Sequence, residues 1–267
     1  MARDETAEPR RRLALMLEYD GTAYSGSQLQ KNAPSVQGEL EKALATLTGE
    51  AVRVKMAGRT DAGAHAKGQV ASFLTAAPYT AEAFVRALNY YLPQDVAVKG
   101  VAEVAVEFDV RRQAASRLYR YTIYNGRQRS PLWAGYSWHV PASLDTAAMQ
   151  AAARCLVGRH DFASFAPAMA GHTRRTMMRA DVQRRGELVL LAMEADAFLP
   201  HQVRRTAGAL AQVGLRRLTV AEFGRLVEEP RPGAAGPAAP PQGLCLIRVR
   251  YEGVKFGDGA EEDDADL

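Results

Sequence analysis

The sequence lacks several features that would mark a specialised class of protein. It has no apolar run near the roughly 18 residues that a membrane span needs, and its first twelve residues mix acids with arginines where a secretory signal would have an apolar centre. It has only two cysteines, Cys155 and Cys245, and neither has a partner at metal-ligand spacing. We therefore expect a reduced, cytoplasmic protein with no membrane association.

Lysine is also scarce, so arginine supplies most of the positive charge. Lysine occurs only at positions 31, 42, 55, 67, 99 and 255 among 34 basic residues. The net charge of +4 includes six acids and no bases from residue 258 onward, so the rest of the chain carries +10. Arginine suits phosphates and stacked bases better than lysine does. The positive balance favours a nucleic-acid partner.

The apolar pattern predicts the same order of elements twice. In the first half we expect strands at 12–19, 51–57, 69–75 and about 95–104, with helices that begin after Ser35 and Thr80. In the second half we expect strands at 117–125, 176–184, 187–195 and 244–251, with helices at 144–156, 201–213 and 219–228. The repeat predicts an α+β fold of two ferredoxin-like β-α-β-β-α-β halves.

We expect the two halves to share one extended, largely antiparallel sheet with helices on one face and a cleft between the halves. The first half covers residues 12–112 and the second covers 113–256. Residues 1–11 form a disordered basic N-terminus, and residues 257–267 form a disordered acidic tail. Residues 229–242, rich in proline, glycine and alanine, form a long loop. Such halves also occur in RNA-recognition modules, but these strands lack the closely spaced aromatic motif of those modules.

One glycine-bracketed turn, at residues 57–65, carries Arg59, Asp61 and His65. Glycine allows tight backbone angles and close approach of another molecule, so the turn would present Asp61 outward on a stiff support. Considered alone, the nine residues fit an ordinary turn with an aspartate capping its own backbone at least as well. His65 follows Asp61 at a spacing that suits metal on a helix but not in a turn. We therefore expect no metal.

The same turn resembles the signature of the tRNA pseudouridine synthase A family. Further family motifs occur in order along the chain, at residues 19–26, 35–37, 108–111, 117–125, 161–165, 175–176, 197–208 and 239–246. Three positions differ from the usual pattern: Ser27 replaces an aromatic residue, Asp109 replaces a histidine and Gln202 replaces a methionine. The serine affects how the first loop packs.

The resemblance implies an isomerase that converts uridine to pseudouridine at positions 38, 39 and 40 of the anticodon stem-loop of tRNA. It also implies a homodimer with RNA spanning both subunits. The base changes its point of attachment without a redox change, so no cofactor is needed. One carboxylate, Asp61, is implied as the nucleophile. Attack on the sugar, attack on the base and removal of a sugar proton all remain open.

Three further residues have roles by the same resemblance. Arg204 would pair with Asp61 from the other half, Tyr119 would hold the target uracil, and Arg59 would fill the gap left by the flipped base or grip its phosphate. Without the family, a solvent-exposed position is the better interpretation of Arg204, and it fits Arg59 about as well as a functional one. Tyr121 faces the same side as Tyr119, and we expect it in the core. We also expect His201 to line the cleft.

Two other classes of function compete with this one. A non-catalytic RNA-binding module would bind tRNA and leave no pseudouridine. A metal-dependent nuclease or phosphatase would need clustered carboxylates, whereas the turn carries the single carboxylate of Asp61.

Overall fold

The computed structural model describes residues 10–168 and 171–256. The first half contains β1 (Arg11–Tyr19), α1 (Val36–Thr48), β2 (Lys55–Met56), β3 (His65–Thr75), α2 (Ala81–Tyr91) and β4 (Val96–Val104). The second half contains β5 (Ala114–Tyr124), β6 (Trp138–His139), α3 (Thr146–Arg154), β7 (Gly158–Asp161), β8 (Arg174–Arg185), β9 (Leu188–Ala195), α4 (Gln202–Gly214), α5 (Val220–Glu228) and β10 (Leu244–Tyr251). Short 3-10 helices cover Ala163–Phe165 and Pro241–Gly243.

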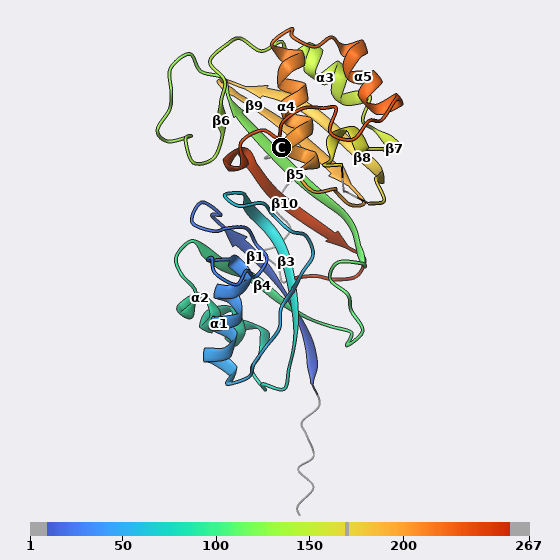
Figure 1. Ribbon diagram of the computed structural model, residues 1–267. Coiled ribbons are helices and arrows are strands. Elements are labelled where there is room, and N and C mark those ends of the chain that lie inside the picture. The colour runs from blue at the N-terminus through green and yellow to red at the C-terminus, as the bar shows by residue number, and fades with distance from the viewer. Residues whose placement is uncertain (1–9, 169–170, 257–267) are drawn as a thin grey trace, which may run out of the picture.

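One sheet runs through both halves (Figure 1). Its strand order is β4-β1-β3-β10-β5-β9-β8-β7, with β2 beside β3 and β6 beside β5. The halves join where β10 runs parallel to β3, pairing Cys245 with His65 and Leu246 with Ala66. In each half the last strand lies beside the first, as the β-α-β-β-α-β unit requires. The predicted fold of two such halves in one sheet, antiparallel along most of its path, is confirmed.

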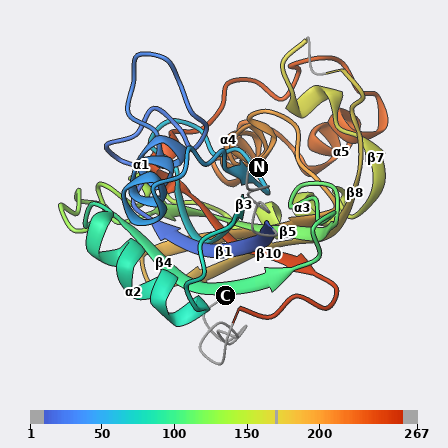
Figure 2. The ribbon, with the colours of Figure 1, turned by 90° about the horizontal axis from the view of Figure 1, so that it is seen from below.

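The core lies between the sheet and its helices. Leu13, Leu15 and Leu17 of β1 are at most 2% exposed, because alternate residues of a strand face the same side. The buried face of α1 presents Val36 and Leu40 at helical spacing. Figure 2 shows α1 and α4 on the same side of β1, β5 and β10. The helices α1 and α4 of the two halves therefore cover the same face of the sheet (Figure 2).

Helix starts follow the predicted caps. The side chain of Ser35 accepts a hydrogen bond from the backbone N–H of Gly38, and Thr80 does the same for Ala83. Each cap satisfies an N–H that the first turn of a helix leaves without a partner.

The strand predicted at 51–57 is wrong in extent, because only Lys55 and Met56 pair with β3. Side chains of α1 form hydrogen bonds to the backbone N–H and C=O of Val54, which would otherwise pair with a neighbouring strand. The Glu41 carboxylate accepts the Val54 N–H at 2.9 Å, and the Gln37 amide donates to the Val54 carbonyl at 3.1 Å. The partner strand starts at His65, four residues before its predicted start. The short strands β6 and β7 were not predicted, since two and four residues are too few to show a period.

Two further predictions concern the two ends of the chain and the 229–242 loop. Residues 1–9 and 257–267, expected to be disordered, lie outside the described residues, and Arg11 already belongs to β1. Residues 229–242 form the predicted long loop, with regular structure only in the 3-10 turn at its end. Within the described ranges, no helix combines the length and apolar character needed to cross a membrane.

Candidate active site

Asp61 lines a cleft of about 330 Å³ that is formed by residues of both halves. The first half supplies Gly58, Arg59 and Asp61, and the second half supplies Tyr119, Phe198, Leu199, His201 and Arg204. This volume falls at the small end of the range for ligand pockets. The cleft therefore brings together all four predicted site residues, which are up to 145 positions apart in the chain between Arg59 and Arg204.

Asp61 is held by two side chains from the other half. Its Oδ2 accepts a hydrogen bond from Nη1 of Arg204 at 2.5 Å, and Nδ1 of His201 lies 2.9 Å from the same oxygen. The Asp61 and Arg204 side chains are 25% and 14% exposed. Arg204 is itself fixed, since its Nε donates to the carbonyl of Ala239 at 2.7 Å. The start of α4 adds the positive end of a helix dipole near the carboxylate.

The turn that carries Asp61 is fastened to the first loop of the chain. Ser27 is 1% exposed; its Oγ accepts the N–H of Thr60 at 2.9 Å, and its own N–H donates to the Thr60 carbonyl. The hydroxyls of Thr60 and Tyr19 lie 2.8 Å apart. Gly63 has φ of 75°, a left-handed angle that suits glycine. Ser27, where the family pattern usually has an aromatic residue, thus fixes the residue immediately before Asp61.

Tyr119 forms an apolar wall of the cleft. It is 6% exposed, and its ring meets that of Phe198 edge to face with centroids 5.1 Å apart. Burial raises the pKa of Tyr119 well above its usual range, so the phenol stays neutral. A Cβ at Gly58 would lie 3.3 Å from the Tyr119 hydroxyl, so a side chain there would require the Tyr119 ring to shift. Tyr121 lies in the core as predicted, and its hydroxyl donates a hydrogen bond to the carbonyl of Pro240.

Two arginines of the cleft, Arg59 and Arg117, differ in how far they are exposed to solvent. Arg59 is exposed and lines the cleft. Arg117 is only 7% exposed, and it donates to the carbonyls of Ala57 and Asp196. Burial lowers the pKa of Arg117. This link between the halves was not predicted. The alternation of Arg117 with Tyr119 and Tyr121 on one face of β5 could have indicated that Arg117 is buried, but not which carbonyls it contacts.

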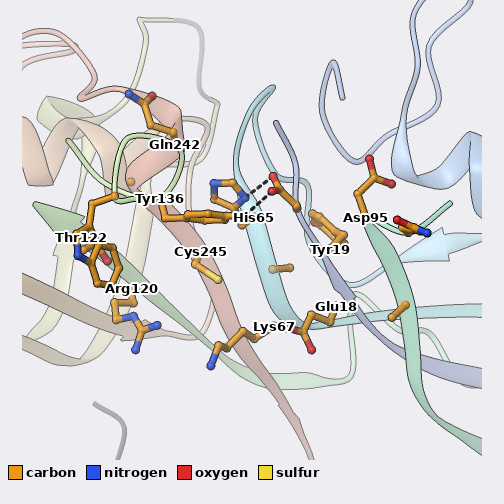
Figure 3. A pocket seen from close by; sticks show the side chains of 16 residues that line it. Glu18, Tyr19, His65, Lys67, Asp95, Arg120, Thr122, Tyr136, Gln242 and Cys245 are labelled. Atoms are coloured by element: carbon orange, nitrogen blue, oxygen red, sulfur yellow. Dashed lines mark hydrogen bonds and ion pairs between the residues drawn. The ribbon is translucent and has the colours of Figure 1, made fainter. Parts of the chain in front are cut away.

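His65 lies on the opposite side of the sheet from Asp61. It lines a separate hollow of about 490 Å³ together with Lys67, Arg120 and Tyr136 (Figure 3). Its Nε2 lies 3.0 Å from the Gly135 carbonyl, and its Nδ1 accepts the Gly21 N–H at 3.1 Å. These contacts anchor the end of the turn that carries Asp61. Among the described residues, no group of three or more His, Cys, Asp or Glu side chains could hold a metal ion.

Comparisons with known proteins agree with this geometry. A family model described as tRNA pseudouridine synthase matches residues 15–111 and 152–252, which defines the class of enzyme. A tRNA pseudouridine synthase A of Pelobacter propionicus is 45% identical over 90% of this chain and 100% of its own length. Those of Geobacter sulfurreducens and Myxococcus xanthus are 45% and 46% identical over 90% of this chain, covering 100% and 92% of their lengths. The chain belongs to the tRNA pseudouridine synthase A family.

Proposed function

We propose that this protein isomerises uridine to pseudouridine at positions 38, 39 and 40 in the anticodon stem-loop of tRNA. One observation carries the proposal: a carboxylate on a stiff turn, Asp61, is clamped by Arg204 at 2.5 Å inside a cleft between two halves. The cleft is of a size for one nucleotide base. The remaining surface is rich in arginine, which suits a phosphate backbone.

In this proposal Asp61 is the nucleophile. Isomerisation breaks the N1–C1′ bond and forms a C5–C1′ bond, while a proton leaves C5 and a proton is added at N1. The bonds and electrons balance within the nucleotide, so the reaction needs no oxidant and no cofactor. A charged Arg204 keeps a negative oxygen in place in a cleft where the Asp61 side chain is three-quarters buried. Arg204 also donates to the carbonyl of Ala239, so the 229–242 loop helps to fix the guanidinium that holds Asp61.

Substrate binding falls to Tyr119 and Arg59. A uridine in a stem must leave its stack before C5 and C1′ become accessible. The buried ring of Tyr119 then offers a surface for the extruded uracil, and such stacking is worth about 1–3 kcal/mol per base. The exposed guanidinium of Arg59 lies two residues before Asp61, where it contacts the phosphate or fills the gap in the stem.

Three further features belong to this proposal: a homodimer, a place in the cytoplasm and the boundary between the two halves. We propose a homodimer, supported by Leu132, which is 86% exposed, and by Tyr136, which is 49% exposed, on one long loop. The free thiols of Cys155 and Cys245 suit a reducing cytoplasm. The boundary between residues 12–112 and 113–256 falls between the end of β4 at Val104 and the start of β5 at Ala114.

The test is release of tritium from tRNA labelled at C5 of uridine, followed by mapping of pseudouridine in the product. Release, with pseudouridine at positions 38 to 40, is expected. Binding of tRNA with no release would favour a non-catalytic RNA-binding module. Cleavage of the RNA that stops on addition of a chelator would favour a metal-dependent nuclease.

A further inference from the structure

His201 stands immediately before α4 in a backbone conformation that is rare for residues with side chains. Its φ is 59° and its ψ is 6°. Within the described ranges, Arg216 is the one other non-glycine residue with positive φ. The residue before a helix commonly caps it with its side chain, yet the imidazole of His201 makes no such hydrogen bond. Backbone strain of this kind often accompanies a functional requirement.

The side chain of His201 turns instead toward the catalytic turn of the other half. Its Nδ1 lies 2.9 Å from Oδ2 of Asp61. A carboxylate oxygen can only accept a hydrogen bond, so Nδ1 carries the proton. Arg204 donates to the same oxygen. No described residue makes a hydrogen bond to Oδ1, the second oxygen of Asp61.

We infer that His201 is a positioning residue for Asp61, an inference that rests on the proposed function. Two donors to Oδ2, His201 just before α4 and Arg204 in its first turn, fix the carboxylate and leave Oδ1 directed at the extruded nucleotide. With Arg204 alone, the carboxylate pivots about a single contact. Misplacement of a reacting group by about 1 Å can slow a reaction roughly 100-fold. The left-handed backbone at His201 is what brings the imidazole within reach.

Two substitutions separate positioning from a purely backbone role. Glycine adopts the left-handed conformation without steric cost, so His201→Gly keeps or relaxes the start of α4 and removes only the donor. Asparagine also tolerates this conformation. Its Nδ2 stands the same number of bonds from Cβ as Nδ1 of histidine, so His201→Asn returns an N–H to nearly the same place.

The experiment measures kcat and KM for tritium release from C5-labelled tRNA, together with the thermal unfolding temperature of each variant. We expect His201→Gly to lower kcat about tenfold or more with KM within about twofold. Its unfolding temperature should stay within a few degrees of wild type, because relief of the left-handed backbone strain offsets the lost hydrogen bond. We expect His201→Asn to recover kcat to within about threefold of wild type. A His201→Gly enzyme with wild-type kcat would overturn the inference, and so would equal losses in both variants.

Wild-type enzyme and Asp61→Asn, run beside these variants, keep this result distinct from the proposed function. If the wild type releases no tritium, the proposed function fails. If wild type is active and Asp61→Asn is inactive, but His201→Gly matches wild type, then only the role of His201 is wrong.

Discussion

Replacing Arg204 by methionine tests the contact that defines the site. Methionine replaces the apolar stem of the arginine side chain but removes the guanidinium that donates to Oδ2 of Asp61. A hydrogen bond to a charged group contributes about 1.5–3 kcal/mol, which corresponds to roughly a tenfold to 150-fold change in rate. Because the Asp61 side chain is 25% exposed, water replaces part of the lost contact. We therefore expect kcat to fall by about tenfold, at the lower end of that range.

Arg205→Met is the matched control. Arg205 follows Arg204 in α4 and donates to the Gly236 carbonyl at 2.6 Å, so both arginines hold the 229–242 loop. Both variants lose one positive charge and one contact to that loop, but only Arg204 contacts Asp61. Single-turnover tritium release at saturating enzyme isolates the chemical step from RNA binding. Equal rates for the two variants would refute the clamp on Asp61.

Three further predictions concern Tyr119 in the wall of the cleft, Ser27 beside the turn that carries Asp61, and Asp20 directly after β1. Tyr119→Leu should lower kcat/KM for tRNA about fivefold to 150-fold through lost stacking, whereas Tyr119→Phe, which keeps the ring, should stay within a few-fold. Ser27→Ala leaves the buried Thr60 N–H without its acceptor, at a cost of about 1–3 kcal/mol, so calorimetry should show unfolding roughly 2–10 °C lower. Burial alone would raise the pKa of Asp20, but hydrogen bonds from Thr22 and Tyr136 outweigh it and lower that pKa. The stabilisation from the charged Asp20 is therefore fully present above its unfolded pKa near 4, and it is lost as the pH falls through the lower pKa of the folded state. The difference in unfolding free energy between wild type and Asp20→Asn should therefore shrink below about pH 4.

The elements that could be predicted from the sequence are those governed by local rules. Alternating leucines specified β1, and the hydroxyls of Ser35 and Thr80 specified where two helices start. The order of elements in each half followed from their spacing, and it led to the correct fold because the β-α-β-β-α-β unit closes in one common way.

The features that escaped prediction depend on contacts between distant parts of the chain. The strand at 51–57 was cut short because Glu41 and Gln37 of α1 capture the backbone of Val54. The family resemblance indicated the pairing of Arg204 with Asp61, whereas the His201 contact depends on one left-handed residue that no pattern marks. Arg117 shares one face of β5 with Tyr119 and Tyr121, but its hydrogen bonds to carbonyls of both halves depend on how the chain folds.

The most direct test of the central claim is Asp61→Asn, assayed for tritium release from C5-labelled tRNA and for tRNA binding. Asparagine keeps the size of the side chain and removes the charged oxygen that acts on the nucleotide. The account predicts a folded protein that binds tRNA at least as tightly as wild type and releases no tritium above background. Release by Asp61→Asn at a rate near that of wild type would contradict it.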